Sequence, residues 1–297
     1  MKNHPVVRAF VRLSRLKFLT GGFLGFALGA AVARYDGAYI DWQVYVLGQF
    51  MVTSFHLMVH YANDYYDRFC DASTERTAWS GGSGALLEGG LPARVALSAA
   101  FFCAGLGTLA IGLFAARGAY LPAIVGIAIA ILAWSYSAPP MRLLERGWGE
   151  LDTAVIVALL FPLAGYVAFA HAPALRLFAS TLPSVAAMFV LMFCVEYPDV
   201  DSDRASGKMN LVARFGRERT RYLIYAAVGG IYAGTASAIV LGGAVPLAFF
   251  SALTIPIAWF LCSRLDATDP ADVAAAGVAL FVATILGSTL AYVALIL

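Results

Sequence analysis

Long apolar stretches separated by shorter polar segments run along almost the whole chain. Nine of them are close to the ~20 residues that an α-helix needs to cross a bilayer. These stretches are residues 18–34, 42–62, 95–115, 119–137, 151–170, 179–197, 221–242, 244–262 and 274–297. They are too long and too continuous for the strands of a membrane barrel, which alternate over roughly ten residues. The pattern therefore predicts an all-α polytopic membrane protein with nine transmembrane helices, because helices satisfy their own backbone in lipid.

Composition supports this class. Apolar residues make up 61% of the 297 residues and charged residues 13%, whereas a soluble domain carries about 25% charged residues. This balance excludes an ordinary soluble globule. We expect one integral-membrane domain over residues 1–297, since no Ser- or Pro-rich linker divides the chain. Residues 1–17 are basic and amphipathic, and we expect them to lie at the membrane interface rather than to act as a signal peptide.

Basic residues are distributed unequally between the two sides that nine spans define. All but three of the 20 Lys and Arg residues fall on the side of the N-terminus, the exceptions being Arg34, Arg117 and Arg176. The positive-inside rule places that side in the cytoplasm. All but two of the 18 Asp and Glu residues lie there as well, although acidic residues do not set topology. Their clustering predicts a polar site facing the cytoplasm, and no patch typical of nucleic-acid binding is evident.

Two acidic clusters follow the second and sixth predicted spans. In the first, Asn63, Asp67 and Asp71 are spaced i, i+4 and i+8, so they share one stripe if the segment is helical. In the second, Asp199 and Asp203 repeat the i, i+4 spacing. A solvated acidic helix end would explain one cluster, but two packed together without a cation would repel each other. Because Mg²⁺ prefers carboxylate oxygens and bridges to phosphates, the pair of clusters predicts a Mg²⁺ site for a diphosphate.

Other polar side chains in the same loops are candidates for gripping the ligand. Arginine binds phosphate through a planar fork of donors, and lysine binds it as a point charge. The positive-inside rule alone would also place basic residues here, so this alternative stays open for each of them. Asp64 is either a further ligand or a residue that orients one, and Tyr136 belongs either to the interfacial aromatic belt or to the site. The candidate substrate-binding residues are Asn63, Asp64, Arg68, Tyr136, Arg142 and Lys208.

His56 and His60 form a further i, i+4 pair on the segment that leads to Asn63. Two histidines at this spacing are able to bind a metal, but apolar residues surround them. Two buried histidines with satisfied hydrogen bonds are the favoured interpretation.

Taken together, the motifs resemble those of the UbiA superfamily of intramembrane aromatic prenyltransferases. The family pattern Asn-x-x-x-Asp-x-x-x-Asp matches residues 63–71, and its second pattern, Asp-x-x-x-Asp, matches residues 199–203. The family run Tyr-Ser-x-Pro-Pro-x-Arg-Leu matches residues 136–143. A run that follows the second Asp motif matches residues 207–216, except that Asn210 and Ala213 replace Thr and Val.

The resemblance implies a helical bundle around a central cavity that opens sideways to lipid. It also implies that both Asp motifs bind Mg²⁺ and a prenyl diphosphate. The metal ligands would then be Asn63, Asp67, Asp71, Asp199 and Asp203, with the four aspartates as catalytic residues. The run Asn-Asp-Tyr-Tyr-Asp, together with the Gly-rich stretch 81–84 and residues 88–92, looks most like the menaquinone branch of the family. That branch prenylates 1,4-dihydroxy-2-naphthoate, and the resemblance places the protein in a bacterial or archaeal cell membrane.

Several alternatives remain at this point. Within the family, the acceptor is alternatively 4-hydroxybenzoate, a chlorin, haem or a glycerol phosphate. A cation-coupled transporter is a candidate of another class, and it would need ionisable residues at mid-membrane on several spans. The predicted spans contain few such residues, so the enzyme is favoured; prenyl chain length and oligomeric state are left open.

Overall fold

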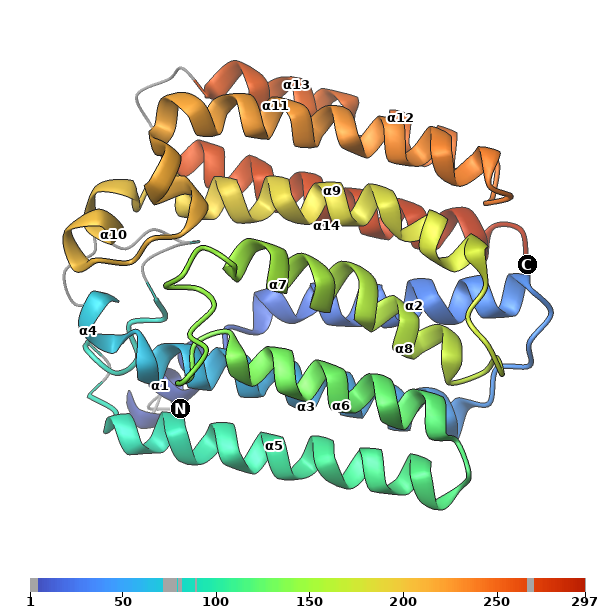
Figure 1. Cartoon of the computed structure of the whole chain (residues 1–297), viewed down its shortest axis with the longest axis horizontal. Helices are drawn as coiled ribbons and strands as arrows, with labels where there is room; N and C mark the ends of the chain where they lie inside the picture. The colour runs from blue at the N-terminus through green and yellow to red at the C-terminus, as the bar shows by residue number, and fades with distance from the viewer. Residues whose placement is uncertain (1–4, 72–78, 80–81, 89, 266–269, 297) are drawn as a thin grey trace.

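The computed structural model describes residues 5–71, 79, 82–88, 90–265 and 270–296. Over this part of the chain the structure is all-helical, without a β-strand. The longer helices lie side by side along one common direction (Figure 1). The predicted all-α class is therefore confirmed.

The helices of the described residues are α1 (Pro5–Leu13), α2 (Thr20–Tyr35), α3 (Trp42–Tyr66), α4 (Arg68–Asp71), α5 (Ala93–Ala116), α6 (Tyr120–Ser135), α7 (Gly149–Val155), α8 (Phe161–Val167), α9 (Leu175–Glu196), α10 (Val200–Ser206), α11 (Leu211–Val240), α12 (Leu247–Ala252), α13 (Ile255–Arg264) and α14 (Pro270–Val293). Two short segments join neighbouring helices: a 3₁₀ turn (Leu16–Leu19) precedes α2, and a π-helical segment (Ile156–Leu160) joins α7 to α8.

Each predicted span overlaps a helix or a pair of consecutive helices, but their number is not confirmed as nine. Seven helices in the described part of the chain are long and apolar enough to cross a membrane. Helix α6 is apolar but has 16 residues. Helix α3 has 25 residues and is not among the seven; it buries polar side chains, including Gln49, His56 and His60. These polar residues lower the mean hydropathy of α3. They are tolerated there because they are buried in the protein interior rather than exposed to lipid.

The bundle consists of two groups of packed helices, which meet at α2 and the α7–α8 segment. Helix α3 packs against α5 and α6, and α9 packs against α11 and α14, while α2 packs against α8. A Cβ atom added at Gly29 of α2 would lie 1.8 Å from the carbonyl oxygen of Pro162, and one at Gly165 would lie 2.1 Å from that of Phe26. The two backbones are therefore in direct contact, which small residues make possible between membrane helices.

The segments that carry the acidic clusters lie at one end of the bundle. Helix α4 follows α3, α10 follows α9, and α4 contacts α10. Both short helices lie at the left end in Figure 1, whereas the C-terminal end of α14 lies at the right. The fold thus brings together two clusters that are far apart in the sequence.

The N-terminal helix α1 also lies near this end (Figure 1). It exposes the apolar side chains Val6, Val7, Phe10 and Val11. Its exposed Arg12 pairs with Glu88 at 3.0 Å. Its location at the membrane interface remains a prediction.

Candidate functional site

The first acidic cluster is built where α3 ends. Asp67 is the C-cap of α3, and its side chain is buried. The Asn63 amide donates to Asp67 Oδ2 at 2.8 Å and to the Ser137 hydroxyl at 3.0 Å. The i, i+4 contact between Asn63 and Asp67 is therefore present. The predicted continuous stripe is wrong, however, because the helix breaks at Asp67 and restarts as α4, which ends at Asp71. The side chain of Asp71 lies outside the described residues.

The second cluster is built by α10 and the turn that follows it. Asp203 is buried, and the Asn210 amide donates to its Oδ2 at 2.7 Å. The Oδ1 atom of Asn210 accepts a hydrogen bond from the backbone N–H of Ala213 at 2.7 Å, so Asn210 also caps α11. Asp199 is the N-cap residue of α10 and is half-buried. The predicted pair is thus unequal in burial, with Asp203 facing the interior.

Lys208 joins the two clusters. Its Nζ lies 3.8 Å from Asp67 Oδ2 and 3.8 Å from Asp203 Oδ1. Burial lowers the pKa of Lys208, but the two carboxylates raise it more, so the ammonium stays charged. Burial raises the pKa of Asp67 and of Asp203, while Lys208 and the neighbouring amides work against that rise. The ammonium is the counter-ion of both carboxylates.

The carboxylates fit a divalent cation by their chemistry. Asp67 and Asp203 come from different helices and converge on one cationic atom, as oxygen ligands of Mg²⁺ would. The described residues contain no group of three or more His, Cys, Asp or Glu side chains placed to hold a metal. These residues bring Asp67 and Asp203 together, whereas the predicted ligand Asp71 has its side chain outside them.

Three predicted substrate-binding residues have other partners in this structure. Asp64 is buried, and it accepts hydrogen bonds from the Arg15 guanidinium and the Ser83 hydroxyl. Arg68 donates to the backbone carbonyl of Tyr65, three residues earlier in the chain. Arg142, at φ +45°, pairs with Glu145 at 3.1 Å through both carboxylate oxygens. Among the described residues, none of the three forms an ion pair with Asp67 or Asp203, both of which pair with Lys208.

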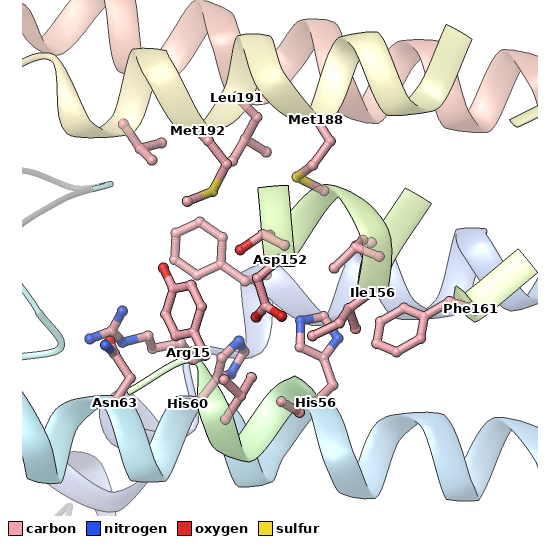
Figure 2. Close-up of a pocket in the computed structure, with 18 of the residues that line it drawn as sticks. Arg15, His56, His60, Asn63, Asp152, Ile156, Phe161, Met188, Leu191 and Met192 are labelled. Atoms are coloured by element: carbon pink, nitrogen blue, oxygen red, sulfur yellow. The ribbon is translucent and has the colours of Figure 1, made fainter. Parts of the chain in front are cut away.

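A cavity of about 190 Å³ opens beside the Asn63 side chain and continues into the bundle. Tyr136 and Asn63 both line it, which favours the position beside the acidic clusters over the aromatic belt for Tyr136. Its role in substrate binding stays a prediction. Figure 2 shows Arg15 and Asn63 at one end, and Phe161 at the other. Apolar side chains, including Met188, form much of the remaining wall. A cavity lined by several helices is therefore present, as the resemblance implied, and its sideways opening to lipid stays a prediction.

Asp152 also lines this cavity, and the sequence analysis missed it. It lies on α7 and is buried, with 5% of its surface exposed. The signal was available, because a carboxylate inside an apolar stretch is a functional-site candidate by default. Asp152 stands alone in the predicted span 151–170 and repeats no i, i+4 spacing, so the motif patterns do not single it out.

The sequence pattern of the UbiA prenyltransferase family matches residues 23–294. The chain belongs to this family. It is therefore a prenyltransferase and an integral membrane protein, as the sequence motifs predicted.

Among curated relatives, this UbiA-family chain is 20% identical to 1,4-dihydroxy-2-naphthoate octaprenyltransferase of Bacillus subtilis, over 82% of its own length and 78% of the relative's. It is 26% identical to 2-carboxy-1,4-naphthoquinone phytyltransferase of Synechocystis over 38% of its length and 36% of the relative's. Its fold is similar to that of a UbiA homolog from Archaeoglobus fulgidus bound to DMAPP and Mg²⁺, with a TM-score of 0.68 and 19% identity. That match covers 96% of this chain and 99% of the other.

Proposed function

We propose that this prenyltransferase transfers a polyprenyl group from a polyprenyl diphosphate to 1,4-dihydroxy-2-naphthoate. The observation that carries the proposal is the convergence of Asp67 and Asp203 on Lys208, close to a cavity that Asn63 and Tyr136 line. This arrangement offers a charged mouth for a diphosphate and an apolar interior for its hydrocarbon tail. The names of the two curated relatives support the naphthoate acceptor.

The cation site follows from the same carboxylates. We place Mg²⁺ between the two clusters, with Asn63, Asp67, Asp71, Asp199 and Asp203 as its ligands. When bound, it would neutralise the charge that develops on the diphosphate as the bond to the prenyl carbon breaks. The solved relative that holds DMAPP together with Mg²⁺ is consistent with this choice.

The chain's own residues bind and shield the reacting groups in this proposal. Lys208 would hold a diphosphate oxygen as a point charge, and Arg142 and Arg68 would do so after leaving their present partners. The half-buried ring of Tyr136, which lines the cavity, would offer its π face to the allylic cation. The apolar walls of the cavity would limit the access of water to that cation, which water would otherwise capture.

We also place the protein in a bacterial or archaeal cell membrane as a single integral-membrane domain, with the N-terminus and both acidic clusters in the cytoplasm. The concentration of Lys and Arg on one side supports this orientation.

The test is diphosphate release by purified protein in detergent, with Mg²⁺ and a labelled polyprenyl diphosphate. Asp203→Asn is expected to lower turnover by at least about 100-fold, because it removes a buried charge at the proposed cation site. Asp201→Asn is the matched control: it lies on the same helix, is exposed, and pairs with Arg217 at 2.9 Å. We expect the control to keep turnover within about twofold, since exposed ion pairs contribute little.

The acceptor is decided in the same assay by comparing 1,4-dihydroxy-2-naphthoate with 4-hydroxybenzoate. Turnover with the naphthoate alone supports the full proposal. Turnover with the benzoate alone would keep the reaction and overturn the acceptor. Full turnover by Asp203→Asn would refute the assigned role of the second acidic cluster.

A further inference from the structure

Asp152 is a buried carboxylate without a partner in the described part of the chain. Neither of its oxygens has a hydrogen-bond partner there, and its surface is 5% exposed. In Figure 2 its carboxylate points into the cavity, toward the rings of His56 and His60. All three side chains line the same cavity.

Such a group is costly to keep without a ligand. Burying a polar group without a hydrogen-bond partner is unfavourable, and burying an ionised carboxylate is more so. A prenyl chain is hydrocarbon and offers no hydrogen-bond donor, so it does not account for Asp152. The apolar walls suit a hydrocarbon ligand. Asp152 suits a second ligand, one that carries a hydrogen-bond donor.

The two histidines are fixed on the opposite side of this space. The Nδ1 atom of His60 lies 3.0 Å from the backbone carbonyl of Ser14, which accepts a hydrogen bond only from a protonated nitrogen. The ring centroids of His56 and His60 are 4.8 Å apart. His56 Nδ1 is buried without a hydrogen-bond partner among the described residues. A Cβ at Gly22 would lie 2.7 Å from that nitrogen, so glycine leaves room for the imidazole.

We propose that Asp152 and His56 form the subsite that binds a ring hydroxyl of the aromatic acceptor, with Asp152 as the base that takes its proton. The inference rests on the proposed prenyl transfer and names the part of the acceptor that the cavity recognises. The carboxylate accepts the hydroxyl O–H, and His56 donates to the hydroxyl oxygen. The acceptor class is therefore an aromatic ring with a free hydroxyl conjugated to the carbon that is alkylated.

The step balances without a further reagent. The ring carbon supplies the electron pair for the new C–C bond, and the prenyl C–O bond breaks with its pair on the diphosphate. The hydroxyl proton moves to Asp152, and the former hydroxyl carbon of the ring becomes a ketone. The proton on the alkylated carbon then passes to the released diphosphate, while Asp152 returns its proton to the ketone oxygen. The ring is aromatic again, and the carboxylate is restored.

The test uses Asp152→Asn, which keeps the size of the side chain but cannot take a proton. We expect kcat/KM for the acceptor to fall by about 10²–10⁴-fold, as for loss of a general base. The KM for the prenyl diphosphate should change less than about twofold, because Asp152 is not part of the proposed diphosphate site. Ser184→Ala is the matched control. Ser184 Oγ is also buried and has no hydrogen-bond partner among the described residues, but Ser184 does not line the cavity.

A substrate change separates this role from a structural one. An acceptor whose hydroxyl is methylated keeps an electron-rich ring but has no proton to give. Wild-type protein should lose most of its activity on the ether, and Asp152→Asn should lose nothing further. Equal use of the ether and the free hydroxyl by the wild type, or unchanged kcat/KM for the free hydroxyl in Asp152→Asn, would overturn the inference.

Two comparisons cover the remaining outcomes. If Asp152→Asn does not fold, the affinity of wild-type protein for two acceptor analogues is measured instead. The compound with the free hydroxyl should bind at least about tenfold more tightly than the analogue with hydrogen in its place. Equal affinity for the two compounds overturns the inference. Wild-type turnover that persists in Asp152→Asn would refute this subsite alone. Absence of wild-type turnover with every acceptor would refute the proposed function and this inference with it.

Discussion

Replacing Lys208 by methionine tests whether its ammonium holds the two acidic clusters together. Lys208 Nζ lies 3.8 Å from one oxygen each of Asp67 and Asp203. At that distance and an effective dielectric constant of about 20, each pair contributes about 4 kcal/mol of Coulomb energy. Desolvation of the three charges offsets much of this sum. Because breaking a buried ion pair leaves its partner uncompensated, we expect the variant to lose about 3–5 kcal/mol of stability without metal.

A divalent cation should reverse most of that loss. In Lys208→Met the two carboxylates have no ammonium between them, so Mg²⁺ binds without competing with a fixed charge. A ligand present at about 100 times its Kd stabilises the folded state by about 2.7 kcal/mol. We therefore expect Mg²⁺ to raise the melting temperature more in the variant than in the wild type.

The assay is thermal unfolding in detergent, with EDTA and then with excess Mg²⁺. Arg264→Met is the control, because Arg264 pairs with Asp272 at 3.6 Å where both side chains are nearly half exposed. Its loss should stay below about 1 kcal/mol and should not respond to Mg²⁺. Equal melting temperatures of Lys208→Met and wild type in EDTA, or an equal Mg²⁺ response, would refute the reasoning.

Three further predictions concern packing, capping and the cation. Gly29→Ala should strongly lower the melting temperature, because its Cβ would lie 1.8 Å from the Pro162 carbonyl oxygen, whereas Gly105→Ala, with nothing within 4 Å, should be tolerated. Asn210→Ala should cost about 1 kcal/mol of stability through loss of the α11 cap, and Asn210→Thr should recover most of it, since threonine also caps helices; equal unfolding of the two variants would contradict this. EDTA should abolish diphosphate release and added Mg²⁺ should restore it, and turnover that persists in EDTA would speak against metal dependence.

The helices were predictable because long apolar runs leave few alternatives. The expected span 95–115 corresponds to α5 (Ala93–Ala116), and 42–62 corresponds to the first part of α3 (Trp42–Tyr66). The start of α11 was not predicted, since apolar residues begin near 221 while the helix begins at Leu211. Asn210 caps it there, and the backbone departs from helical angles at Gly216, where φ is +76°. Capping and glycine breaks set helix ends in polar sequence, where hydropathy carries no signal.

The candidate site was predictable as far as residue spacing describes it. The spacing correctly paired Asn63 with Asp67, because i and i+4 are neighbours on a helix. It could not show that Lys208 lies between Asp67 and Asp203, nor that Arg142 turns to Glu145. These contacts depend on how α3, α10 and the intervening loops meet in space. Local sequence identifies the charges but not their partners.

Asp152 differs from Asp67 and Asp203 in a way that bears on the proposed reaction. All three carboxylates are buried, but two face an ammonium and the third has no hydrogen-bond partner among the described residues. A diphosphate carries several negative charges, so its place is beside the cations at the mouth. A phenolic hydroxyl is able to enter the interior with its proton and to give it up there, where the Asp152 carboxylate has no competing hydrogen-bond donor among the described residues. The separation of compensated from uncompensated carboxylates thus assigns the two substrates of the proposed reaction to different depths of one cavity.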